Sequence, residues 1–225
     1  MNKNIVKKID DKVKINNILV SVSDKSGLNI FIPELVKLNS KLIILSTGGT
    51  YTHIKQILGK KSKTMLKKVS DYTKQPETQG GLVKTLDFKI YLGILTETYN
   101  ANHQEDLKRT NAKIIDMVVA NLYPFKETIE KQKGDLACEH ARGNIDIGGP
   151  SMIRAAAKNF IRTASVVDPL SYPFIVQKLK KNKGALLLED RFLLAAKAFK
   201  HTADYDKTIA DYLNTRDINE VKACY

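Results

Sequence analysis

The sequence predicts a single α/β domain built on a parallel sheet, with helices on both faces and a helical C-terminal extension. Two observations lead to this prediction. A short apolar run, a polar turn and a helix-periodic segment follow one another, and the same succession then repeats at once. Two consecutive units of this kind indicate parallel strands with covering helices. A chain of 225 residues, 43% of them hydrophobic, is long enough to bury the core of such a domain.

The first unit begins at residue 18. Residues 18–22 are expected to form a strand, residues 23–27 (Ser-Asp-Lys-Ser-Gly) a turn, and residues 28–38 a helix whose apolar positions share one face. The turn offers hydroxyl, carboxylate and ammonium groups, which fit either a ligand contact or a helix cap beside a solvated lysine. Residues 1–16 are polar and lack periodicity, so they are expected to form a flexible basic arm before a domain over residues 17–213.

The second unit carries a Gly-rich turn. Residues 42–45 are expected to form a strand and residues 51–58 a helix, with Ser-Thr-Gly-Gly-Thr at 46–50 between them. Glycines let backbone N–H groups approach an anion, and the following helix presents its positive end. The turn therefore fits a phosphate cradle, although an ordinary Gly-rich turn would have the same pattern. It is not a Walker A loop, because the GK[ST] ending is absent.

The remaining chain continues the α/β pattern. Further strands are expected at 90–95, 114–120 and 163–167, and the loop-like residues 70–85 are long enough to suggest a functional loop. Residues 144–150 lead into a helix at 151–158, and the longest helix is expected at 188–213, followed by a tail at 214–225.

A third polar cluster surrounds the helix predicted at 151–158. Asp146 precedes it, and Ser151, Arg154 and Lys158 share one of its faces. Small neighbouring residues could leave Lys158 partly desolvated, which would lower its pKa toward a range useful for proton transfer. A surface lysine paired with a carboxylate fits the same pattern.

The composition favours a small anionic partner over a nucleic acid. The net charge is +13, yet only six of the 37 basic residues are arginine, the residue best suited to bidentate phosphate or guanine recognition. No secretory signal and no run of eighteen apolar residues occurs, so a cytoplasmic location is expected. Cys138 and Cys224 show no metal-ligand spacing, and we expect neither a zinc site nor a disulfide.

Seven segments of the chain form an ordered set of motifs. They are residues 20–27, 45–50, 83–86, 121–125 (Asn-Leu-Tyr-Pro-Phe), 144–149 (Asn-Ile-Asp-Ile-Gly-Gly), 154–159 (Arg-Ala-Ala-Ala-Lys-Asn) and 197–203. In this order they resemble one known family, the bifunctional purine-biosynthesis enzyme that pairs AICAR formyltransferase with inosine monophosphate (IMP) cyclohydrolase. The resemblance covers residues 18–213 and the amino-terminal, cyclohydrolase half of that family; the transformylase half is absent from this sequence. It implies a methylglyoxal-synthase-like fold and closure of formyl-AICAR to IMP and water, with no metal or organic cofactor. A homodimer or a separate transformylase partner would be compatible with it.

The resemblance also implies the site. It assigns proton transfer to Lys158, with Lys84, Tyr123 and Asp146 as helpers. It assigns the nucleotide contacts to Ser23, Asp24, Lys25, Thr47, Gly48, Gly49, Thr50, Val83, Lys84, Thr85, Ala120, Asn121, Asp146 and Ile147.

The sequence departs from the family pattern next to this predicted site. Leu82 replaces a usual arginine, Asp87 and Phe88 replace His-Pro, and Tyr91-Leu92 replaces a further His-Gly or His-Ala. Three alternatives therefore stay open: a nucleotide-binding domain with reduced or lost turnover, a methylglyoxal-synthase-like lyase, and a nucleic-acid-binding protein, which the charge allows and no motif supports.

Overall fold

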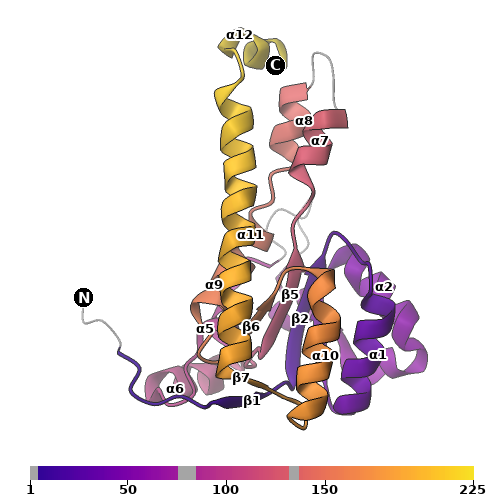
Figure 1. Ribbon diagram of the computed structural model, residues 1–225, viewed down its shortest axis with the longest axis vertical. Coiled ribbons are helices and arrows are strands. Elements are labelled where there is room, and N and C mark those ends of the chain that lie inside the picture. Colours follow the sequence, from indigo (N-terminus) through magenta and orange to yellow (C-terminus); the bar gives the residue numbers. More distant parts are fainter. Residues whose placement is uncertain (1–4, 76–84, 132–136) are drawn as a thin grey trace.

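A parallel sheet forms the centre of the molecule. The computed structural model describes residues 5–75, 85–131 and 137–225, and within them five parallel strands run in the order β4-β3-β2-β5-β6 (Figure 1). The predicted fold class is confirmed. The strands are β2 (Asn17–Val22), β3 (Ile43–Ser46), β4 (Leu66–Lys68), β5 (Met117–Asn121) and β6 (Ala164–Val166).

Each central strand supplies side chains to both faces of the sheet. On β2, Ile18 and Val20 join one core cluster and Leu19 joins the other, and β5 alternates in the same way with Val119 and Val118. Successive side chains of a strand point to opposite faces, and strands covered on both sides are therefore apolar throughout. This explains why the predicted strands are continuous apolar runs.

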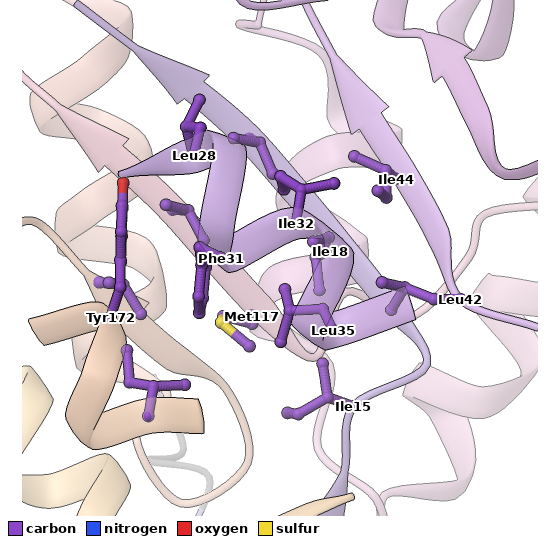
Figure 2. Packing of buried hydrophobic residues seen from close by; sticks show 14 of the residues in the cluster. Ile15, Ile18, Leu28, Phe31, Ile32, Leu35, Leu42, Ile44, Met117 and Tyr172 are labelled. Carbon is purple, nitrogen blue, oxygen red and sulfur yellow. The ribbon is translucent and has the colours of Figure 1, made fainter. Parts of the chain in front are cut away.

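Helices cover the two faces of the sheet (Figure 1). On one face, α1 (Leu28–Leu38), α2 (Gly48–Leu58) and α10 (Tyr172–Lys181) enclose the first cluster, in which the rings of Phe31 and Tyr172 stack with centroids 4.2 Å apart (Figure 2). On the other face lie α5 (Phe88–Leu95), α9 (Gly148–Lys158) and α11 (Leu188–Asn214). The other helical elements are η1 (Gly59–Lys61), α3 (Ser62–Met65), α4 (Val69–Thr73), α6 (Ala101–Thr110), α7 (Phe125–Lys131), α8 (Ala137–Gly143), η3 (Pro169–Ser171) and α12 (Ile218–Ala223).

The strand predicted at 90–95 is wrong, because this segment is helix α5. The Asp87 carboxylate caps the helix by accepting a hydrogen bond from the Lys89 N–H at 2.7 Å. Ile90 and Ile94 are buried one helical turn apart. A short, wholly apolar run has no distinctive periodicity, so the pattern alone cannot separate a strand from a buried helix. Strand β4, which has two lysines among its three residues, was not predicted.

The predicted flexible arm is wrong for its last seven residues. Residues Lys12–Lys14 form β1, which pairs antiparallel with β7 (Ala185–Leu187). The buried Arg191 guanidinium donates hydrogen bonds to the carbonyls of Asp10 and Asp11 at 2.9 and 3.0 Å. The segment is tied to the domain through main-chain atoms, and main-chain pairing leaves little trace in side-chain periodicity.

The C-terminal region is helical, as predicted. Helix α11 has 27 residues and extends beyond the sheet, with α7 and α8 beside its far half and α12 at its end (Figure 1). Edge-to-face contacts of Phe125 with Tyr205 and Tyr212 join α7 to α11. None of the described helices is both long and apolar enough to cross a membrane.

Candidate functional site

Three groups of predicted site residues lie at or just after the carboxyl ends of strands: Ser23–Lys25 at β2, Thr47–Thr50 at β3 and Asn121 at β5. Parallel strands present these ends at the same edge of the sheet, where ligands of α/β proteins bind. Direct hydrogen bonds join the three loops. The Asn121 side-chain oxygen accepts from the N–H groups of Ser23 and Asp24 at 2.7 and 2.9 Å, and its amide nitrogen donates to the Asp24 carbonyl at 2.9 Å.

The Gly-rich turn is held against β2 by its threonines. The Thr50 hydroxyl donates to the Val22 carbonyl at 2.9 Å and accepts from the Val22 N–H at 3.1 Å, and the hydroxyls of Ser21 and Thr47 lie 3.1 Å apart. Gly48 has a φ of +48°, in the left-handed region that favours glycine. The turn therefore holds the N-terminus of α2, whose first N–H groups have no partner inside the helix, at the sheet edge.

A cavity of about 670 Å³ adjoins this turn. Lys55 enters it from α2 and Lys68 from β4, and neither forms an ion pair among the described residues. The Gln75 side-chain oxygen, also in its lining, is buried with no hydrogen-bond partner in the described part of the chain. A helix N-terminus and two ammonium groups together favour an anion. The complete lining is Ser46, Thr47, Gly48, Tyr51, Thr52, Lys55, Lys68, Val69, Ser70 and Gln75.

The Ser23–Lys25 turn lies against the same helix end. The Lys25 ammonium donates to the Ser23 carbonyl at 3.1 Å, and a Cβ added to Gly49 would meet the Lys25 side chain at 3.8 Å. Hydrogen bonds from Ser26, chiefly that of its side chain, hold the pKa of Asp24 below its ordinary value. The turn thus presents a carboxylate and an ammonium group beside the first turn of α2.

Asp146 caps α9 at this edge. Its carboxylate accepts from the Gly149 N–H at 2.9 Å, and its own N–H donates to the Tyr205 hydroxyl at 2.8 Å. Burial raises the pKa of Asp146 above its ordinary value, although the backbone N–H groups of Gly149 and Gly148 oppose the shift. A Cβ on Gly149 would lie 2.3 Å from the carboxylate, so only glycine fits there. Such a carboxyl group is suited to proton transfer.

Tyr91 is a neighbour of Asp146. In the sequence it stood out only as a residue that departs from the family pattern. Burial raises the pKa of its phenol, and the Asp146 charge adds to this shift. The hydroxyl is buried and has no partner within hydrogen-bond geometry in the described residues; the Ser151 hydroxyl lies near it but donates to the Ile147 carbonyl at 2.8 Å. Tyr91 therefore holds an unused donor beside the carboxylate.

The other expected site residues are not in these turns, and they differ in their exposure. Thr85 is buried, with its side chain against Gly148, and Ala120 is buried in β5. Ile147 and Tyr123 are largely exposed, at 60% and 56%. Val83 and Lys84, like Leu82 and most of the predicted loop at 70–85, lie outside the described residues.

Lys158 does not meet Asp146. It is the last residue of α9 and is exposed, so of the two interpretations left open by the sequence, the partly desolvated lysine is wrong and the surface lysine fits its exposure. Ten residue steps separate it from Gly148, which is about 15 Å along the helix axis. The N-terminus of α9 lies at the site edge of the sheet, and its C-terminus lies at the opposite edge, near the start of β6. Ser151, Arg154 and Lys158 do share a face, but Arg154 is exposed like Lys158, and the small residues Ala155 and Ala156 are buried on another.

Sequence reasoning missed Lys55 and Lys68. A signal for Lys55 was present, because positions 48, 51, 52 and 55 have the spacing of one helix face. No comparable signal exists for Lys68, because its strand was not recognised.

The chain is similar to known families and proteins. Residues 28–151 match the family described as MGS-like domain, and residues 156–224 match the family described as AICARFT/IMPCHase bienzyme. The chain is 46% identical over 208 residues to the bifunctional purine biosynthesis protein PurH of Thermoanaerobacter sp. (strain X514), covering 91% of this chain and 39% of the relative. It is 45% identical to the protein of the same name from Prochlorococcus marinus subsp. pastoris, covering 87% and 36%.

A solved structure is similar as well. The structure described as "Crystal structure of ForH" superposes with a TM-score of 0.71 at 28% identity, covering 87% of this chain and 97% of that one. The chain thus spans less than two fifths of the length of these two curated relatives but nearly the full length of this structural neighbour.

Proposed function

Because this chain belongs to the family of MGS-like domains, and its relatives over that region are bifunctional purine biosynthesis proteins, we propose that it is an IMP cyclohydrolase. It would bind formyl-AICAR and close the second purine ring, giving IMP and water. A transformylase, in the same polypeptide or separate, would supply the formylated substrate. The location that fits this pathway role is the cytoplasm.

The observation that best supports this proposal is the anion site at the start of α2. A nucleotide 5′-phosphate matches the free N–H groups of the helix and the ammonium groups of Lys55 and Lys68. We propose that Thr47 to Thr50 contact the phosphate. The remaining nucleotide contacts proposed from the resemblance are Ser23, Asp24, Lys25, Val83, Lys84, Thr85, Ala120, Asn121, Asp146 and Ile147.

The chemistry asks little of the protein beyond folding the substrate and moving protons. The carboxamide nitrogen attacks the formyl carbon, and its proton must leave as the new C–N bond forms. The former formyl oxygen then becomes a hydroxyl, which is protonated and departs as water, and the nitrogen that carried the formyl group loses its proton as the C=N bond forms. Since both groups belong to one molecule, positioning lowers much of the barrier. We propose that the Asp146 carboxyl group, with its raised pKa, exchanges these protons, and that Tyr123 and Lys84 are its helpers, as the resemblance implies.

Lys158 requires a second copy of the chain if it is to act on this substrate. Its ammonium group is exposed and lies at the opposite end of α9 from Asp146. Beside it, the exposed rings of Phe192 and Phe199 lie one above the other on α11, and Arg154 stacks on Phe199 at 5.5 Å. An aromatic surface next to an exposed ammonium group suits a contact between copies. We propose a homodimer in which this face supplies Lys158 to the partner's nucleotide.

A nucleotide-binding domain without turnover is the second candidate. Asp87, which replaces a family histidine, is buried as the cap of α5, and Phe88 is 60% exposed, so neither provides a proton donor to the site. An absorbance assay with formyl-AICAR separates the two candidates. The proposed function requires turnover by the wild-type chain and its loss in Asp146→Asn. Binding of IMP without any turnover would establish the second candidate.

A further inference from the structure

A second basic groove lies along β4, one of the two outermost strands of the sheet. Its volume is about 450 Å³, and it is formed by the edge strand β4, helix α4, the start of α5 and the segment after α6. Five lysines and a single carboxylate line it. The lysines are Lys67, Lys68, Lys74, Lys89 and Lys113, and the carboxylate is that of Asp71.

The lysine charges in this groove are not neutralised by the described residues. Within that part of the chain none of the five lysines forms an ion pair, although lysines elsewhere do, such as Lys178 with Asp190 at 2.8 Å and Lys180 with Glu34 at 2.6 Å. Like charges converging on one concave surface raise its potential and attract anions. The lysines come from three separate stretches of the chain, residues 67–74, Lys89 and Lys113, so the groove is a product of the fold and not of one local run of charge.

The groove borders the cavity at the Gly-rich turn. Lys68 and Tyr51 line both, and the Lys68 ammonium lies 5.6 Å from the centre of the Tyr51 ring. An anion in the groove and a phosphate at the turn would therefore draw on the same lysine. Binding at one site would weaken binding at the other, and by linkage this effect is reciprocal.

The volume of the groove and its lysine lining indicate the class of its ligand. Its volume lies within the range of small-molecule sites. Lysines act as mobile point charges and suit a flexible chain of phosphates, whereas specific duplex recognition relies on arginine pairs and a long contact surface. We propose that this groove binds a compact oligophosphate group, and that its occupation lowers the affinity of the neighbouring site for nucleotide.

Calorimetry on the full chain with sodium tripolyphosphate tests this proposal. Lys67→Ala/Lys113→Ala should weaken tripolyphosphate binding at least tenfold. Lys41→Ala/Lys222→Ala removes the same charge from exposed positions outside the groove and should change binding less than twofold. Tripolyphosphate should also weaken IMP binding in wild type, but not in the groove variant. Magnesium-free ATP as a second ligand distinguishes a free oligophosphate from a nucleoside triphosphate.

Besides an absence of tripolyphosphate binding, two results would overturn the proposal. One is equal loss of binding in both double variants, which would mean diffuse charge attraction. The other is a DNA duplex that displaces tripolyphosphate at physiological salt, which would assign the groove to nucleic acid. Formyl-AICAR turnover is measured in parallel. Turnover without tripolyphosphate binding would refute only this inference, and tripolyphosphate binding without turnover would refute only the proposed cyclohydrolase.

Discussion

The side chain of Asn121, at the end of β5, holds the main chain of Asp24 from both sides. Its oxygen accepts from the Asp24 N–H and its nitrogen donates to the Asp24 carbonyl, each at 2.9 Å. The same oxygen also accepts from the Ser23 N–H at 2.7 Å. One amide thus sets the position of the turn after β2, which in turn lies against the start of α2. A residue that resembles a ligand contact is therefore also a part of the site's framework.

Asn121→Ala should loosen this turn and weaken nucleotide binding. Three hydrogen bonds to main-chain atoms are lost, each worth about 0.5–1.5 kcal/mol. We expect IMP affinity, measured by calorimetry, to fall at least tenfold. Asn121→Asp keeps the accepting oxygen and loses the donor, so its affinity should be intermediate. If alanine and aspartate behaved alike, the bridge would not be what positions the turn.

The two glycines of the phosphate turn should respond differently to alanine. Gly48→Ala places a Cβ at a φ of +48° and should cost about 1–2 kcal/mol of stability, besides weakening IMP binding. Gly49→Ala meets only an ordinary contact with Lys25 at 3.8 Å, so it should fold normally and weaken IMP binding alone. Gly59→Ala is the matched control. Gly59 has a φ of +53° away from the site, so this variant should lose stability and keep IMP affinity.

Inosine provides the complementary comparison. Wild type should bind IMP at least tenfold more tightly than inosine, because the phosphate is the group that the turn recognises. Equal affinities would exclude the phosphate cradle whatever the alanine variants show.

The buried ion pair between Arg162 and Asp116 should contribute strongly to stability at the amino ends of β5 and β6, opposite the site. Both side chains are only 6% exposed, and the carboxylate also accepts from the N–H groups of Asn16 and Asn17 at 2.9 and 2.8 Å. Asp116→Asn leaves the guanidinium buried without its counter-charge and should cost about 3–5 kcal/mol in denaturant unfolding. Asp204→Asn, which breaks an exposed i,i+4 pair with Lys200, should cost under about 1 kcal/mol. Equal losses would mean that Arg162 is rehydrated.

The sequence predicts the sheet well because its strands are buried on both faces. Continuous apolar runs separated by polar turns locate β2, β3, β5 and β6 to within a few residues. Helix α5 escapes the same reasoning because it is also buried and wholly apolar. The pairing of β1 with β7 depends on main-chain atoms and on Arg191, a contact across 180 residues that no local pattern encodes.

The parts of the site that lie in turns could be predicted from the sequence. The position of a residue along a helix axis relative to the site could not. The Gly-rich turn, the Ser23–Lys25 turn and Asp146 all lie at the expected edge of the sheet. The face shared by Ser151 and Lys158 was also predicted correctly. A shared face, however, says nothing of position along the axis, and ten residue steps carry Lys158 to the other end of the domain.

Asp146→Asn should separate stability from activity, with a defined pH dependence. Burial raises the pKa of this carboxyl group in the folded state above its pKa in the unfolded chain, which is near 4. Its charged form therefore destabilises the fold once the pH exceeds about 4. The variant should therefore unfold at a higher temperature than wild type at pH 7, and this difference should disappear as the pH falls below about 4. The ring-closing rate should drop by about two orders of magnitude or more. A variant less stable than wild type at pH 7 would show that the charge on the α9 cap outweighs its burial.

Lys158→Arg tests whether a second copy completes the site. Arginine keeps the charge but cannot give up a proton near neutrality, so the ring-closing rate should fall by about two orders of magnitude while IMP affinity stays within a fewfold. If Lys158 acts across a dimer, mixing inactive Lys158→Arg with inactive Asp146→Asn should restore activity. Half of the randomly formed dimers would be mixed, each with one intact site of two, which gives about a quarter of the wild-type rate. If activity is not recovered on mixing, Lys158 and Asp146 would have to act in the site of the same chain. That outcome would contradict the proposal, which is based on their separation along α9. A Lys158→Arg variant with the wild-type rate would remove Lys158 from the mechanism, and Tyr91→Phe would then test the remaining donor beside Asp146.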